Sequence, residues 1–277
     1  MKKRQTLCSF GCSWTAGVGA HYIPGMDESK FKNEAWEQDI IYPCSFRGIL
    51  SKKFSLNNFN ISIGGASNDY NFEQAQEIFG DPKRKQDFLS KNPIVLWGIT
   101  STARIYRKEK NIFLRPNRFT SILYFLEDHY AKNPSVEDLK LILQDQELLY
   151  ISLYLKLYYD HDQEVRRLAN LIETWNEIFA YHNVPVIWFD TFNTHKYYNN
   201  PRNFLPGGDL LSQMLKKEKI KYKTSKKWYH LSDWVDDDDR ISKGVKNNLL
   251  NPFTFHPGQH GHQIIADILT PAIEQYL

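Results

Sequence analysis

The length, composition and charge of the chain set the first limits on what it can be. Of its 277 residues, 42% are hydrophobic and 24% are charged, which is ordinary globular usage and excludes collagen, coiled coil and disorder for most of the chain. The net charge of +3 is too balanced for a nucleic-acid binder, in which a basic stripe is expected. The length alone allows one or two domains.

The chain carries three cysteines, Cys8, Cys12 and Cys44. So few cysteines give no disulfide framework and are typical of a reducing compartment. The basic start at residues 1–4 is not followed by the apolar stretch of a signal peptide, and no run reaches the roughly 18 apolar residues of a membrane span. We therefore expect a soluble, cytoplasmic protein without a membrane partner.

Four short apolar runs predict buried strands, at residues 6–10, 60–63, 94–97 and 186–189. None alternates over a long span, which favours strands covered on both faces in a parallel sheet. Apolar stripes with helical spacing lie between and after them, at residues 46–54, 72–79, 139–143, 165–179 and 263–269. Pro43 is expected near the start of the first of these helices, and Ser135 is expected to cap the third.

Strands that alternate with helices predict an α/β fold with three layers, α/β/α, around a central parallel sheet. The stretch 195–250 is polar and only weakly periodic, and it contains the aspartate run 236–239. We expect it to be an elaboration within a single domain, 1–277. The aspartate run predicts a solvated loop, with a cation site as the alternative.

Small and polar residues follow the predicted strands. Ser13 comes after Gly11 at the end of the first strand, Gly64 and Gly65 follow the second, and Thr100 follows the third. The carboxyl ends of parallel strands meet at one edge of a sheet, where α/β proteins bind ligands. Taken singly, each motif equally predicts a helix cap or a tight turn.

A histidine-rich segment lies near the C-terminus. Residues 255–262 read Phe-His-Pro-Gly-Gln-His-Gly-His and lead directly into the last helical pattern. Histidine is the usual base for a serine nucleophile. The segment therefore supplies a candidate partner for Ser13.

In this order, the motifs resemble the SGNH (GDSL-like) hydrolase superfamily over nearly the whole chain. The most specific parts are residues 10–13 and 256–266. The variant, with Gly-Cys-Ser-Trp and Trp-Gly-x-Thr-Ser, looks like forms carried by phages and bacteria. The resemblance implies a flavodoxin-like parallel sheet and a hydrolase that needs no metal or organic cofactor.

The resemblance also implies roles for individual residues. Ser13 would be the nucleophile and His256 the general base, and the backbone N–H groups of Ser13 and of Gly64 or Gly65 would bind the oxyanion. The implied activity is that of an esterase or O-deacetylase, acting on an acylated carbohydrate or a small acyl ester.

The sequence departs from the family pattern at the oxyanion hole. Thr100 stands where the family has an asparagine whose side chain completes the hole, and Asn68 or Ser67 is a candidate substitute. Losing one such donor costs about 2.7–4 kcal/mol of transition-state stabilisation.

A second departure concerns the acid that orients the histidine. Phe253 stands three residues before His256, where the family has an aspartate. Asp190 and Asp233 are candidate acids, a backbone carbonyl could orient the ring instead, and a Ser–His dyad is the remaining alternative.

Three residues are candidates for substrate contact. Trp14 and Trp97 lie within the strand-end motifs, and aromatic rings can shape a binding pocket. Arg104, just past the third strand, is expected to bind an anionic substrate group, with a surface ion pair as the alternative.

Other classes of function remain as alternatives. An SGNH-like protein without its acid could bind a glycan or a protein without turnover, using exposed tryptophans drawn from Trp14, Trp36, Trp97, Trp228 and Trp234. A zinc site would use His256, His260 and His262, but the spacing matches no zinc motif and Pro257 argues against a helix there.

Nucleotides and nucleic acids are weaker alternatives. The spacing of Gly17 and Gly19 starts a dinucleotide fingerprint, but Tyr22 stands where the next glycine is required. The lysine-rich stretch 216–227 predicts a solvated loop, so no nucleic-acid partner is expected.

Overall fold

The computed structural model describes residues 4–102, 108–109, 112–113, 160–192, 194–197, 199, 201–223 and 239–277. The helix predicted at 139–143, its cap Ser135, and the candidates Arg104 and Asp233 lie outside these ranges. So do residues 236–238 of the aspartate run and the end of the lysine-rich stretch.

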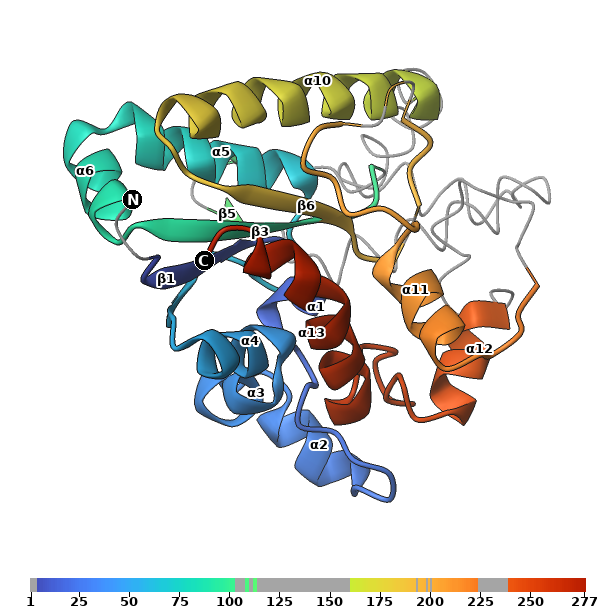
Figure 1. The fold of residues 1–277 in the computed structure, drawn as a ribbon. Coiled ribbons are helices and arrows are strands. Elements are labelled where there is room, and N and C mark those ends of the chain that lie inside the picture. The colour runs from blue at the N-terminus through green and yellow to red at the C-terminus, as the bar shows by residue number, and fades with distance from the viewer. Residues whose placement is uncertain are drawn as a thin grey trace.

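One parallel sheet forms the centre of the described structure (Figure 1). Its strand order is β2-β1-β3-β6, and every neighbouring pair is parallel. The strands are β1 (Thr6–Phe10), β2 (Asn57–Asn60), β3 (Pro93–Ile99) and β6 (Val186–Asp190). A separate antiparallel ladder joins β4 (Lys108–Glu109) to β5 (Ile112–Phe113).

Side chains of the inner strands alternate between two apolar cores. From β3, Ile94 and Leu96 enter one core, and Val95 and Trp97 enter the other. Every residue of β3 is buried, so this strand is covered on both faces. This explains why the strands read as continuous apolar runs.

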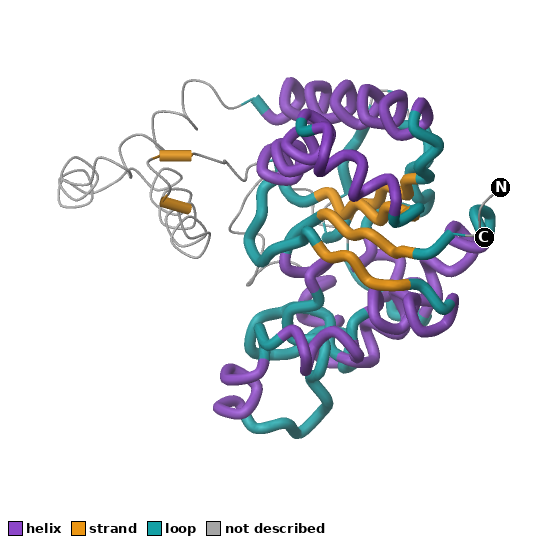
Figure 2. The backbone as a smooth tube through the Cα atoms, turned by 90° about the vertical axis from the view of Figure 1, so that its left-hand side faces the viewer, coloured by secondary structure: helices purple, strands orange, loops and turns teal. Residues whose placement is uncertain are grey.

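Helices cover both faces of the sheet, as Figures 1 and 2 show. One face carries α5 (Asn68–Gly80), α6 (Pro82–Ser90) and α10 (His161–Tyr181). The other carries α1 (Ser13–Ala16), α4 (Phe46–Phe54) and α13 (Gln259–Glu274), with α2 (Glu28–Glu34), α3 (Gln38–Cys44), α11 (Leu210–Lys217) and α12 (Asp239–Lys246) beyond them. The prediction of a three-layer α/β/α sandwich with a flavodoxin-like parallel sheet is confirmed.

Two predicted boundaries are wrong by a few residues. The second strand ends at Asn60, not Ile63, because the Asn60 side chain bonds to both the N–H and the carbonyl of Ser62 and turns the chain. Pro43 lies inside α3, and α4 is capped by Ser45, whose Oγ accepts from the Gly48 N–H.

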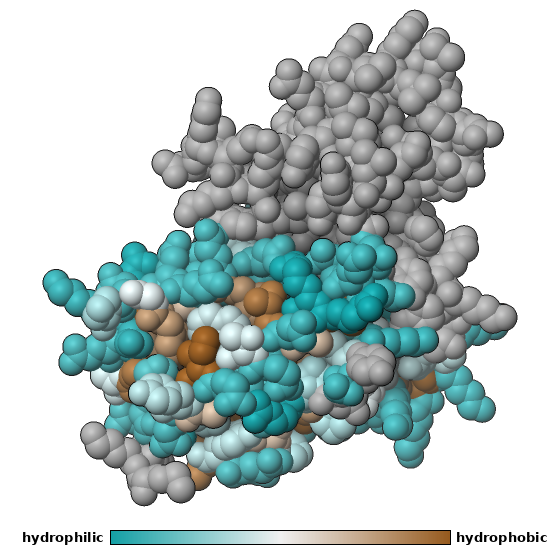
Figure 3. All heavy atoms as spheres, turned by 90° about the horizontal axis from the view of Figure 1, so that it is seen from above, coloured by the Kyte–Doolittle hydropathy of each residue, from teal (hydrophilic) through white to brown (hydrophobic). Residues whose placement is uncertain are grey.

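Part of the polar stretch 195–250 packs against the rest of the structure. Leu211, Met214 and Leu215 of α11 and Ile241 of α12 join the same core as Leu7 and Leu269. Seen from above, the described surface is largely hydrophilic, with smaller apolar areas between (Figure 3). No helix within the described ranges is long and apolar enough to cross a membrane.

Candidate active site

Ser13 and His256 meet at the carboxyl edge of the sheet. The Oγ of Ser13 lies 2.7 Å from the Nε2 of His256, although 243 residues separate them. Ser13 is the first residue of α1, directly after β1, and His256 lies two residues before the N-cap of α13. The distance is that of a nucleophile and its base in direct hydrogen bond.

A sharp turn between β1 and α1 places Ser13 at this point. Gly11 has a φ of 149°, and a Cβ on it would lie 2.3 Å from the Oγ1 of Thr15. The N–H of Gly11 donates to the Oδ1 of Asn71 at 3.1 Å, which ties the turn to α5. Only glycine fits here, because any side chain would collide with the first turn of α1.

The second ring nitrogen of His256 fixes the tautomer of the imidazole. Its Nδ1 lies 2.8 Å from the carbonyl oxygen of Thr254. A carbonyl can only accept a hydrogen bond, so Nδ1 carries the proton in the neutral ring. The Nε2 lone pair then faces the Ser13 hydroxyl, as a general base requires.

Asn251 organises the loop that presents this carbonyl. Its Oδ1 accepts from the N–H groups of Phe253 and Thr254 and from the Thr254 hydroxyl. Its Nδ2 and its own N–H both donate to the carbonyl of His256, each at 2.8 Å. Phe255 has a φ of 56°, a left-handed conformation that turns the His256 ring back over Thr254. Nothing in the sequence marks this role except the position of Asn251, five residues before His256.

Asp190 is not the partner of His256, which corrects one candidate acid. Its carboxylate accepts from the N–H of His195 at 2.9 Å and from the Nδ1 of the same residue at 2.7 Å, and the hydroxyl of Tyr197 donates to it. The carboxylate closes the loop after β6. The position three residues before His256 is held by Phe253, whose ring packs on Tyr22 and Phe31.

The segment that contains Gly64 and Gly65 is hydrogen-bonded to the turn that carries Ser13. The N–H of Ile63 donates to the carbonyl of Gly11 at 3.3 Å, which holds the following glycines beside the β1–α1 turn. Among the described residues, the N–H groups of Ser13, Gly64 and Gly65 have no hydrogen-bond acceptor. Gly65 has a φ of 75°, so the turn that presents these groups favours glycine.

The side chains predicted to complete the oxyanion hole are mostly occupied elsewhere. Asn68 binds both backbone groups of Thr100, with its Nδ2 on the carbonyl and its Oδ1 on the N–H, each at 2.9 Å. The Oγ of Ser67 accepts from the N–H of Tyr70 and caps α5. The Thr100 hydroxyl is buried and has no partner in the described structure.

Trp14 and Trp97 are buried in the two cores, which corrects the prediction that they contact substrate. Trp97 is fully buried and stacks on Phe10, with ring centroids 4.4 Å apart. Trp14 is 1% exposed and packs beside Phe192 in the opposite core. The two rings therefore pack on opposite faces of the sheet, one in each core.

Two buried basic groups lie behind the site. Arg47 is fully buried and donates to the carbonyls of Thr15 and Ala16 at 2.8 and 2.6 Å, which are the last residues of α1. Burial lowers the pKa of Arg47 to about 10, so it is charged at neutral pH. Burial, reinforced by the charge of Arg47, lowers the pKa of His262 to about 3.

The three C-terminal histidines have separate surroundings. His256 faces Ser13, the Nδ1 of His262 accepts from the N–H of Phe46, and His260 lies 3.8 Å from Glu218. In the part of the chain that the structure describes, no group of three or more metal-ligating side chains is placed to hold an ion.

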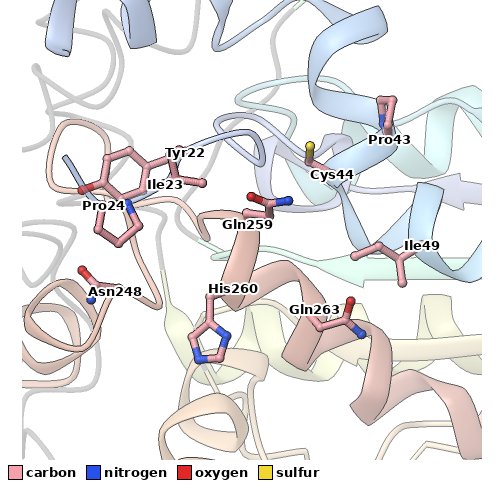
Figure 4. A pocket seen from close by; sticks show the side chains of 10 residues that line it. All are labelled: Tyr22, Ile23, Pro24, Pro43, Cys44, Ile49, Asn248, Gln259, His260 and Gln263. Atoms are coloured by element: carbon pink, nitrogen blue, oxygen red, sulfur yellow. The ribbon is translucent and has the colours of Figure 1, made fainter. Parts of the chain in front are cut away.

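A cavity of about 390 Å³ lies between the start of α13, the end of α3 and the segment around Tyr22 (Figure 4). Neither Ser13 nor His256 lines it. Its walls are Tyr22, Ile23, Pro24, Pro43, Cys44, Ile49, Asn248, Gln259, His260 and Gln263.

Comparisons with known proteins complete the description. No family model matches the chain, and no curated protein matches it. Among solved structures, the chain is similar to a lipase/acylhydrolase from Enterococcus faecalis, with 12% identity and a TM-score of 0.33, covering 98% of this chain and 96% of that one.

Proposed function

We propose that this protein is a serine hydrolase that cleaves carboxylic esters, with Ser13 as nucleophile and His256 as general base. The observation that carries the proposal is the 2.7 Å hydrogen bond between Ser13 Oγ and His256 Nε2. The bond from His256 Nδ1 to Thr254 supports it, because it gives the ring the tautomer that the chemistry needs.

In the acylation step, His256 Nε2 takes the proton of the Ser13 hydroxyl while Oγ attacks the ester carbonyl carbon. The carbonyl oxygen gains the negative charge and is held by the N–H groups of Ser13 and of Gly64 or Gly65. His256 then returns the proton to the leaving alcohol, and the acyl group stays on Ser13.

In the deacylation step, water loses its proton to His256 and attacks the acyl carbon. Collapse of the second tetrahedral intermediate returns the proton to Ser13 Oγ and releases the acid. One ester and one water give one acid and one alcohol, and His256 carries the proton in each step. The resemblance in sequence favours an esterase or O-deacetylase acting on an acylated carbohydrate or a small acyl ester.

The test is labelling with a fluorophosphonate probe beside hydrolysis of p-nitrophenyl acetate. The probe loses fluoride as Ser13 Oγ bonds to its phosphorus. We expect Ser13→Ala to abolish labelling and turnover, and His256→Ala to slow both by about 10²–10⁴-fold, because the general base is lost.

Matched controls come from the same chain. Ser90→Ala removes an exposed hydroxyl on α6, and His260→Ala removes a half-exposed imidazole close to His256, so both should behave as wild type. Persistent labelling of Ser13→Ala would exclude Ser13 as the nucleophile. A wild type that is neither labelled nor active would favour a binding protein without turnover.

A further inference from the structure

Trp36 is a large aromatic side chain left half exposed at the edge of the candidate active site. It lies between α2 and α3, and 51% of its surface is accessible. Its ring lies directly on Gly64, because a Cβ built on that glycine would stand 2.1 Å from Trp36 Cζ3 and 2.6 Å from Cη2. The ring and the backbone of Gly64 are therefore in van der Waals contact.

The conformation and surroundings of Gly64 indicate why a glycine occupies this position. Unlike Gly65, it has no positive φ, so its backbone does not require glycine. What excludes a side chain at this position is the Trp36 ring. The absence of a Cβ lets the indole approach the segment that carries the proposed oxyanion donors.

A second apolar side chain adjoins this contact. Ile63, the residue before Gly64, is 38% exposed, and its N–H is bonded to the carbonyl of Gly11. Gly11 lies two residues before the nucleophile. Exposed apolar groups next to a catalytic centre mark a surface that a substrate covers.

We propose that Trp36 and Ile63 form the surface that binds the acyl group of the ester substrate. The proposal rests on the function proposed above. In the tetrahedral intermediate, three positions around the carbon are taken by Ser13 Oγ, the oxyanion and the leaving oxygen. The leaving oxygen faces His256, which must protonate it, and the oxyanion faces the N–H groups at Gly64 and Gly65.

The remaining substituent is the acyl chain. It points away from His256, on the side of the segment 63–65, where Trp36 and Ile63 offer apolar surface. Of the two activities proposed above, this surface favours an esterase over an O-deacetylase, with a preference for apolar acyl groups longer than acetyl. Burying each additional methylene against this surface favours the transition state.

The test is the chain-length profile of p-nitrophenyl acetate, butyrate and hexanoate hydrolysis. For the wild type we expect kcat/KM to rise from acetate to hexanoate. For Trp36→Ala we expect the ratio of hexanoate to acetate kcat/KM to fall by about tenfold, a factor typical of a lost apolar contact. Trp36→Phe, which keeps an aromatic ring, should retain most of the ratio, and Ile63→Ala should lower it less than Trp36→Ala.

The matched control is Tyr181→Ala, which removes another exposed aromatic ring, 85% accessible at the end of α10. It should leave the whole profile unchanged. A labelled, active wild type whose ratio is the same in Trp36→Ala would overturn the acyl site alone. A wild type that is neither labelled nor active would overturn the proposed function, and the acyl site with it.

Discussion

The His256 ring is oriented by a neutral group in the described structure. The Nδ1 of His256 donates to the carbonyl oxygen of Thr254 at 2.8 Å, and its Nε2 accepts from the Ser13 hydroxyl. A carbonyl dipole stabilises the imidazolium that forms during acylation less than a carboxylate does. In the proposed mechanism, catalysis depends strongly on how well the His256 ring is positioned.

That positioning depends on Asn251, which is fully buried. The geometry predicts that Asn251→Ala frees the loop 253–256 and slows fluorophosphonate labelling by about tenfold to a hundredfold, because a displacement of about 1 Å at a reacting group has an effect of that size. The rate of labelling against pH is the measurement, since a mobile ring also changes the pH at which the base becomes active.

Asn247→Ala is the control for this prediction. Asn247 is exposed and bonds only to the carbonyl of Lys243 at the end of α12. Its labelling rate and pH profile should match wild type. A labelling rate of Asn251→Ala equal to wild type would show that the loop holds His256 without this side chain.

At the scale of elements, Ser13, the proposed nucleophile, lies on a helix of only four residues. Such a helix is not stable by itself, because nucleating a helix costs more free energy than the hydrogen bonds of a single turn provide. α1 is held at both ends by the rest of the fold. Asn71 binds the turn before it, and Arg47 binds the carbonyls of Thr15 and Ala16 at its end.

Arg47 therefore stabilises α1 from outside the helix, by donating hydrogen bonds to its last two carbonyls. Its other donors reach Asn58 Oδ1 at 3.0 Å and Gln38 Oε1 at 3.2 Å, so one guanidinium joins four acceptors. A lysine ammonium cannot match this planar arrangement. Arg47→Lys should lower the free energy of unfolding by about 2–4 kcal/mol, because buried carbonyls lose their donors.

Urea unfolding measures this loss, with Arg84→Lys as control. Arg84 pairs with Glu77 on the surface at 3.2 Å, and its substitution should change the free energy by less than about 1 kcal/mol. Equal effects of the two substitutions would mean that water satisfies the carbonyls of α1 as well as Arg47 does.

At the scale of the molecule, the sheet brings together motifs from both ends of the chain. The sequence predicted β1, β3 and β6 within two residues at each end because buried parallel strands are continuous apolar runs. It placed β2 three residues late, since this edge strand is Asn-Asn-Phe-Asn and has little apolar signal. Ser13 and His256 could also be identified as candidate site residues from the sequence, because each lies in a short motif.

What could not be predicted depends on contacts between distant segments. Trp97 adjoins a strand-end motif, but its side chain packs in the core between the sheet and helices α5 and α10, and proximity in sequence does not show that. The carboxylate of Asp190 is hydrogen-bonded to His195 rather than to His256. Trp36 stands out only once its ring is seen against Gly64, 28 positions along the chain.

The last helix is joined to the rest of the molecule by a buried histidine. His262, in the first turn of α13, is fully buried, and its Nδ1 accepts from the N–H of Phe46 at 3.3 Å across 216 residues. Its ring also stacks on Phe46, with centroids 5.7 Å apart. Because burial lowers the pKa of His262 to about 3, this connection exists with the ring neutral.

The low pKa makes the stability of the whole molecule depend on pH. An imidazole in the unfolded chain has a pKa of about 6.5, so between about pH 6.5 and 3 the unfolded state binds a proton that the folded state does not. The contribution of His262 is therefore complete above about pH 6.5. It is lost as the pH falls, by up to about 1.4 kcal/mol per pH unit.

His262→Gln removes the titrating group but keeps a side chain that can accept a hydrogen bond. Urea unfolding at several pH values from 7 to 4.5 gives the unfolding free energies of wild type and His262→Gln. We expect the wild type to lose stability relative to His262→Gln as the pH falls. Other titrating groups cancel in that difference. Parallel curves for His262→Gln and wild type would mean that His262 takes up its proton equally in both states, and that the α13–α4 contact does not depend on a neutral ring.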